Sequence, residues 1–76
     1  MRVYEFEAVL RRDATGAETE VKNFKVTEAP TGILLRAIES VREGRYYGDG
    51  QDGENAEEIA EQARIVLLAR ERGWPI

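Results

Sequence analysis

The sequence contains neither histidine nor cysteine, and its only serine is Ser40. Without cysteine the chain has no disulfide and no thiolate metal ligand, and without histidine it lacks the commonest general base near neutral pH. The usual arrangements for nucleophilic catalysis are therefore missing. Carboxylate pairs such as Glu5 and Glu7 are expected on a solvent-exposed strand face, which does not favour acid-base catalysis. These absences favour a protein that is not an enzyme and that uses no cofactor and no metal.

Long apolar runs are also missing. The longest is the stretch 65–69, whereas a membrane-spanning helix needs roughly 18 apolar residues. The first residues, with a glutamate at position 5 and no apolar run after it, do not resemble a secretory signal. Together with the absence of cysteine, this favours a cytoplasmic protein that does not enter a membrane.

The charges are unevenly distributed along the chain. The 15 acidic and 11 basic residues give a net charge of −4, so direct nucleic-acid binding, which requires a basic surface, is not expected. One segment collects six acidic residues: Asp49, Asp52, Glu54, Glu57, Glu58 and Glu61. This segment is either an ordinary solvated face or an acidic surface that imitates phosphates and blocks a nucleic-acid-binding protein.

Two strands are predicted in the first third of the chain. Polar and apolar residues alternate over 3–11, and residues 19–27 are rich in β-branched and aromatic side chains. The segment 13–17 between them contains Asp13 and Gly16, which are typical turn residues. The pattern predicts an antiparallel β-hairpin.

A five-residue loop sets the register of this hairpin. It brings apolar residues together near the open end and opposite charges together on the other face, which favours this register over its neighbours. The predicted pairs are Tyr4 with Val26, Phe6 with Phe24, Ala8 with Lys22 and Leu10 with Glu20 on one face, and Glu5 with Lys25 and Val9 with Val21 on the other.

Two helices are predicted after the hairpin. The first covers 30–43, with Pro30 in its first turn and Gly44 as its stop. The second covers 55–72, with a capping box formed by Asn55 and Glu58. Between them, residues 44–54 are rich in glycine and aspartate and are expected to form an exposed loop. The whole chain, 1–76, is thus predicted to be a single α+β domain of ββαα order, an antiparallel β-hairpin covered on one face by two helices.

The second helix has more apolar residues than one small neighbour requires. Its main apolar face consists of Ile59, Ala63, Val66 and Leu67. Ile65 and Leu68 widen that face. We therefore expect the second half of this helix to be buried on two sides.

The glycine-rich loop contains Gly48, Gly50 and Gly53 in the G-x-G-x-x-G spacing of dinucleotide-binding loops. That motif needs a preceding core strand and a βαβ unit, whereas here a helix precedes it. The acidic residues of the loop do not fit the EF-hand ligand spacing either. Weak ligand or cation binding at this loop is left as an alternative.

Three aromatic residues lie outside the predicted elements. Trp74 follows Gly73 at the position where a Schellman cap places an apolar residue against the last helical turn, which favours cap packing over contact with a partner. For Tyr46 and Tyr47, packing within the chain and contact with a partner are equally favoured.

An isolated two-stranded hairpin is marginally stable, and its edges attract further strands. We therefore predict a small non-catalytic protein-protein interaction module whose protein partner is a second copy of the chain, bound through a hairpin edge or through the second helix. The candidate partner-binding residues are Tyr46, Tyr47, Val9, Val21, Ile65, Leu68 and Trp74. An acidic inhibitor of a nucleic-acid-binding protein is the alternative hypothesis.

Overall fold

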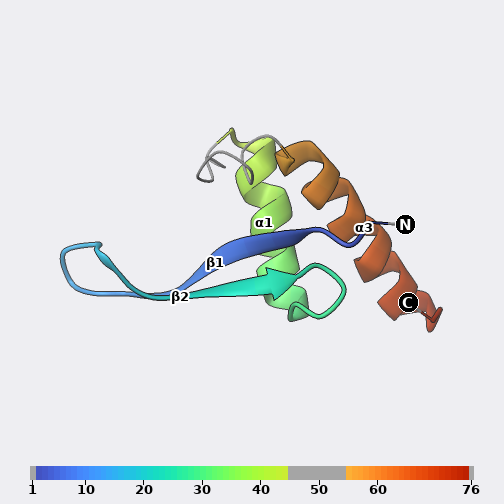
Figure 1. Ribbon diagram of the computed structural model, residues 1–76, viewed down its shortest axis with the longest axis horizontal. Coiled ribbons are helices and arrows are strands. Elements are labelled where there is room, and N and C mark those ends of the chain that lie inside the picture. Colours follow the sequence, from blue (N-terminus) through green and yellow to red (C-terminus); the bar gives the residue numbers. More distant parts are fainter. Residues whose placement is uncertain (1, 45–54, 76) are drawn as a thin grey trace.

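The computed structural model describes residues 2–44 and 55–75. It contains strands β1 (Glu5–Arg12) and β2 (Glu18–Lys25), followed by helices α1 (Thr31–Arg42) and α3 (Ala56–Arg72). Figure 1 shows the two strands as a hairpin and the two helices beside it. The predicted ββαα order is confirmed, and each element begins and ends within two residues of its predicted bounds.

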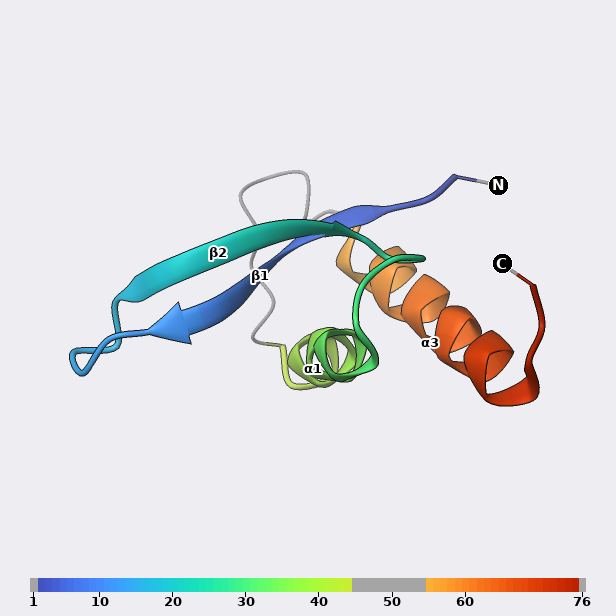
Figure 2. The ribbon, with the colours of Figure 1, turned by 90° about the horizontal axis from the view of Figure 1, so that it is seen from below.

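The helices cover one face of the hairpin at its open end. In Figures 1 and 2 the turn end of the hairpin projects beyond both helices, so the described part of the chain is elongated. Its principal extents are 41 × 23 × 20 Å. The prediction that two helices cover the hairpin therefore holds only for the half of the hairpin that is farthest from the turn.

The hydrophobic core lies where the open end of the hairpin meets the two helices. The hairpin contributes Phe6 and Val26, and the Phe6 ring lies 6.2 Å from the ring of Phe24 between centroids. Both helices contribute small side chains to this core, since Ala37 of α1 and Ala60 and Ala63 of α3 are buried. The buried cluster consists of Phe6, Val26, Ala29, Leu34, Ala37, Ile59, Ala63 and Val66.

The predicted strand register is confirmed from Glu5 opposite Lys25 to Val9 opposite Val21. It fails at the next pair, because Glu20 lies opposite Arg11 instead of Leu10. Leu10 on β1 and Thr19 on β2 have no partner in the strand pairing. Because each strand has one such extra residue, the two irregularities compensate, and Arg12 is again opposite Glu18. Leu10, predicted to lie on the covered face, is 39% exposed.

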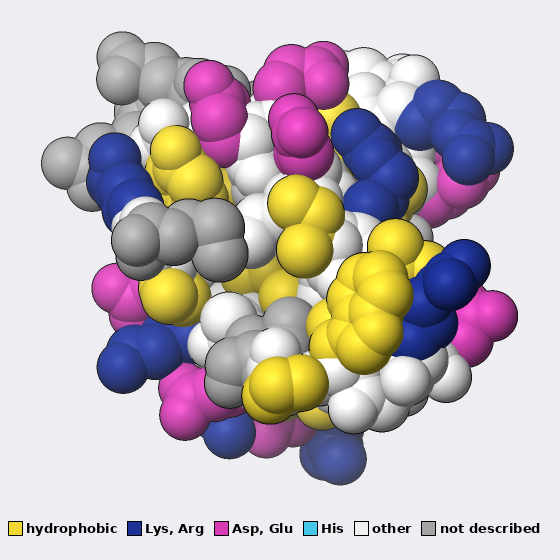
Figure 3. Space-filling model, turned by 90° about the vertical axis from the view of Figure 1, so that its right-hand side faces the viewer, with side chains coloured by type: hydrophobic (Ala, Val, Ile, Leu, Met, Phe, Trp, Pro, Cys, Tyr) yellow, Lys and Arg dark blue, Asp and Glu magenta, His cyan; other side chains and the backbone are white. Residues whose placement is uncertain are grey.

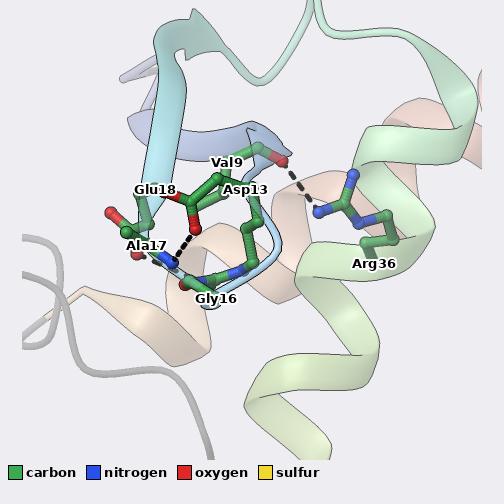
Figure 4. Close-up of polar contacts among 7 residues, drawn as sticks. Val9, Asp13, Gly16, Ala17, Glu18 and Arg36 are labelled. Carbon is green, nitrogen blue, oxygen red and sulfur yellow. Dashed lines mark hydrogen bonds and ion pairs between the residues drawn. The ribbon is translucent and has the colours of Figure 1, made fainter.

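Strands β1 and β2 leave residues 13–17 between them, which is the predicted five-residue loop, and backbone hydrogen bonds inside it close a tighter turn over residues 14–16. The N–H of Asp13 donates to the carbonyl of Ala17 over 3.0 Å, and the N–H of Gly16 donates to the carbonyl of Asp13 over 3.0 Å. Gly16 has a φ of 86°, the left-handed conformation expected at the end of a three-residue hairpin loop. The Asp13 carboxylate also accepts hydrogen bonds from the N–H groups of Thr15 and Ala17 and from the Thr15 hydroxyl, which fixes the turn. Figure 4 shows the contact between Asp13 and Ala17.

The helix ends agree only in part with the predicted caps. Pro30 precedes α1 as its N-cap instead of lying in its first turn, since its ψ of 147° is extended. Asn55 is the N-cap of α3, but at a ψ of 12° its side chain makes no capping hydrogen bond, so the predicted capping box is wrong. The backbone of the predicted Schellman cap is confirmed: Gly73 has a φ of 72°, and the N–H of Trp74 donates to the Ala69 carbonyl over 2.8 Å. The Trp74 side chain, predicted to pack against the last helical turn, is 53% exposed.

Arg70 fastens the C-terminal part of α3 to the connection between β2 and α1. Its guanidinium donates to the carbonyls of Ala29 (2.7 Å) and Thr27 (3.3 Å) and to the hydroxyl of Thr31 (3.0 Å). A planar group with several N–H donors can satisfy three acceptors at once, which a lysine could not do in the same geometry. This contact fixes the position of α3 relative to the hairpin.

The turn predicts an acid-dependent contribution to stability from Asp13. Its pKa lies below the ordinary aspartate value because the Thr15 hydroxyl and the N–H groups of Ala17 and Thr15 donate to the charged form. The unfolded chain therefore binds the proton more readily, and stability is lost as the pH falls below about 4. We expect Asp13→Ala to be less stable than the wild type at pH 7 and to lose less stability between pH 5 and about 2.

Urea unfolding at several pH values measures this difference. Asp13→Asn, which keeps an acceptor oxygen but cannot titrate, is the matched control and should show the flattened acid dependence with a smaller loss at neutral pH. An unchanged acid dependence in both variants would contradict the assignment.

Candidate protein-interaction surface

The outer face of α3 carries exposed apolar side chains. Ile65 is 48% exposed and Leu68 is 40% exposed, and Trp74, just after the helix, is 53% exposed. Figure 3 shows hydrophobic side chains gathered on this side of the molecule between acidic groups and basic groups. The prediction that the second half of α3 is buried on two sides is wrong for the single chain, because the core covers one side only.

Five side chains form a single stripe along this face, which we call the α3 stripe: Glu58, Glu61, Ile65, Leu68 and Arg72. Spacings of three and four residues place them on one side of a helix. All five residues are exposed. The stripe is acidic at its beginning, apolar in its middle and basic at its end.

The end of the stripe is ordered by stacking. The Arg72 guanidinium lies over the Trp74 ring, 5.5 Å from its centroid, and Trp74 is itself fixed by its backbone hydrogen bond to Ala69. A guanidinium over an aromatic face gains a cation-π attraction of about 0.5–1 kcal/mol at an exposed site. Arg72 and Trp74 therefore place a charged guanidinium and an apolar ring next to each other on the surface.

A shallow hollow lies beside the first half of the stripe. It has a volume of about 240 Å³ and is lined by Arg2, Tyr4, Glu58, Glu61, Gln62 and Ile65. The Arg2 guanidinium lies 4.8 Å from the centroid of the Tyr4 ring. The hollow thus combines apolar surface with two carboxylates and one guanidinium.

Gln62 attaches the N-terminal segment to α3 and forms part of this hollow. Its side-chain oxygen accepts from the N–H of Tyr4 (2.9 Å), and its side-chain nitrogen donates to the carbonyl of Arg2 (2.7 Å). These are the two backbone groups, on either side of Val3, that a neighbouring parallel strand would bind. Gln62 is 6% exposed, and no sequence argument singled it out, although its position three residues after Ile59 is on the apolar side of the helix.

The predicted partner-binding residues of the hairpin lie apart from the α3 stripe. Val9 and Val21 are opposite each other, half-buried and 38% exposed respectively. The edge of β1 is partly occupied, because Arg36 of α1 donates to the Val9 carbonyl over 2.9 Å (Figure 4). Irregularities in the ladder and charged side chains next to them disfavour the addition of another strand.

Several predicted residues fall outside the described part of the chain. These are Tyr46, Tyr47, Asp49, Asp52 and Glu54, together with the glycine motif of the loop. Of the predicted acidic surface, Glu57, Glu58 and Glu61 are described, and all three are exposed on α3.

Within residues 2–44 and 55–75, no group of three or more acidic, histidine or cysteine side chains is arranged to hold a metal ion. In the same residues, no helix is both long and apolar enough to cross a membrane. Comparison of the chain with protein-family models, with curated proteins and with solved structures gave no match in any of the three.

The buried amide predicts a stability loss on substitution of Gln62. In Gln62→Leu the N–H of Tyr4 and the carbonyl of Arg2 lose their partners, so we expect the free energy of unfolding to fall by about 1–3 kcal/mol. Urea unfolding measures this loss. Glu61→Gln, an exposed neighbour on the same helix, is the control and should change stability by less than about 0.5 kcal/mol. Equal effects of the two substitutions would contradict the role given to Gln62.

Proposed function

We propose that this protein is a small non-catalytic protein-protein interaction module that binds a second copy of itself through the outer face of α3. The observation that carries the proposal is the exposure of Ile65 and Leu68 on α3 and of Trp74 just after it. An apolar surface rimmed by charged groups is typical of a protein interface.

Energetic considerations support association through this face. Fully burying a leucine or isoleucine side chain contributes roughly 1.5–3 kcal/mol, and tryptophan and arginine are common among the residues that dominate binding. Arg72 and Trp74 are held together by stacking, so less side-chain entropy is lost when a partner binds.

The α3 face is a better candidate than a hairpin edge. Arg36 already donates to a backbone carbonyl at the β1 edge, and the two compensating irregularities interrupt the ladder near the turn. Extra strands add most readily to long, regular edges. We therefore assign self-association to α3 and not to β1 or β2.

The alternative hypothesis is an acidic surface that blocks a nucleic-acid-binding protein. Among the described residues it rests on Glu57, Glu58 and Glu61. Arg64 and Arg72 follow on the same helix, so the described surface carries both charge signs instead of the continuous negative charge that a phosphate mimic needs. We rank this hypothesis below self-association.

Self-association predicts a dimer that apolar substitutions on α3 separate. In the variant Ile65→Ser/Leu68→Ser, the loss of the apolar contacts should raise the dissociation constant by about 10- to 100-fold, the equivalent of 1.4–2.8 kcal/mol. Size-exclusion chromatography with light scattering, over a concentration series, measures the mass of each species.

The matched control is Leu35→Ser, which removes a similarly exposed apolar side chain (55%) from α1. It should leave the dissociation constant unchanged, and circular dichroism should show all variants folded. A wild-type chain that stays monomeric up to high micromolar concentration would overturn the proposal.

A further inference from the structure

We infer that the hollow beside α3 is the receptor site for Arg72 of a second copy, in an antiparallel arrangement of two α3 helices about a two-fold axis. The inference rests on the proposed self-association and specifies its partner group. It is drawn from the order of charges along the α3 stripe and from the chemistry of the hollow that adjoins it.

The lining of the hollow suits a cation on an aliphatic stem. Tyr4 and Ile65 provide apolar surface, and Glu58 and Glu61 provide two carboxylates. Arg2 also lines the hollow, so its formal charge is −1 and one added guanidinium neutralises it. An arginine can lay its methylene groups on the apolar part while its head pairs with a carboxylate.

The α3 stripe supplies that arginine at the right place. Glu61 and Arg72 lie on the same side of the helix, on either side of Ile65 and Leu68, and are about 16 Å apart along the axis. When a second α3 is laid antiparallel with the two-fold axis between Ile65 and Leu68, each Ile65 meets the other copy's Leu68. Each Glu61 then meets the other copy's Arg72.

Two-fold symmetry makes this contact occur twice. Residue i contacts residue j and residue j contacts residue i in such an interface, so one pairing of Glu61 with Arg72 implies a second. A parallel arrangement would instead bring like charges together at both ends, which is unfavourable. The charge order of α3 therefore selects the antiparallel dimer.

Charge exchange between Glu61 and Arg72 tests this pairing. In the Glu61→Arg variant, the new arginine of each copy meets Arg72 of the other copy. In the Arg72→Glu variant, the new glutamate of each copy meets Glu61 of the other copy. Each variant alone should associate about tenfold or more weakly than the wild type, because both copies of the contact become repulsive. Glu7→Arg, the same charge change on the sheet face away from the helices, is the control and should associate as the wild type does.

The decisive measurements are two rescues. The double variant Glu61→Arg/Arg72→Glu restores opposite charges across the interface and should recover most of the wild-type affinity. Mixing the two single variants should give a heterodimer that is tighter than either homodimer, which native mass spectrometry detects from the different masses. Analytical ultracentrifugation gives the dissociation constants.

The outcomes separate this inference from the proposed function. If the wild type dimerises and Ile65→Ser/Leu68→Ser disrupts the dimer, but neither rescue occurs, the pairing of Glu61 with Arg72 is wrong while association through α3 stands. If the wild type is monomeric, the proposed function fails first. Rescue in both the double variant and the mixture supports the antiparallel arrangement.

Discussion

Burial of the open end of the hairpin against both helices is the interaction on which the rest of the structure depends. Phe6 and Val26 are the hairpin's fully buried residues and lie in one cluster with Leu34 and Ile59 from the helices. A two-stranded hairpin alone is marginal in water, so its order depends on this cluster. Because the cluster involves one end of the hairpin only, the turn end must hold its shape through its own hydrogen bonds, among them those to Asp13.

Two polar side chains then decide how α3 lies on that core. Gln62 binds the backbone of the N-terminal segment, and Arg70 binds the backbone between β2 and α1. Both reach backbone groups far away in the sequence, so they fix α3 near its middle and near its end. With its inner side held in this way, α3 turns Ile65 and Leu68 away from the core.

The sequence predicts the elements and most of the register because those depend on short-range patterns. Phe6 opposite Phe24 and Val9 opposite Val21 follow from alternation and from a loop of about the right length. The compensating irregularities at Leu10 and Thr19 leave the alternation of each strand almost unchanged, so periodicity does not reveal them. The role of Gln62 in binding the N-terminal segment is not predicted for another reason, because its partner is a backbone group 60 residues away in the chain.

Part of the candidate surface can be predicted from the sequence, and part cannot. The surplus of apolar residues on the second helix is a local pattern, and Ile65 and Leu68, which widen its apolar face in the sequence, are exposed in the structure. The sequence does not predict whether the chain itself covers Ile65 and Leu68. Their exposure depends on where Gln62 and Arg70 fasten the helix. The hollow could not be anticipated, because Tyr4 and Ile65 meet only in the folded chain.

The charge order of α3 serves the single chain and the proposed dimer in the same way. The helix is stabilised by charges that interact favourably with its dipole, namely Glu57 and Glu58 in the first turn and Arg70 and Arg72 in the last turn. The same order makes the exposed face complementary to itself when two helices run in opposite directions. A domain with so small a core gains stability from any partner that binds only the folded state. In the proposed dimer folding and association are linked in this way, and the exposed apolar residues of α3 contribute to the association.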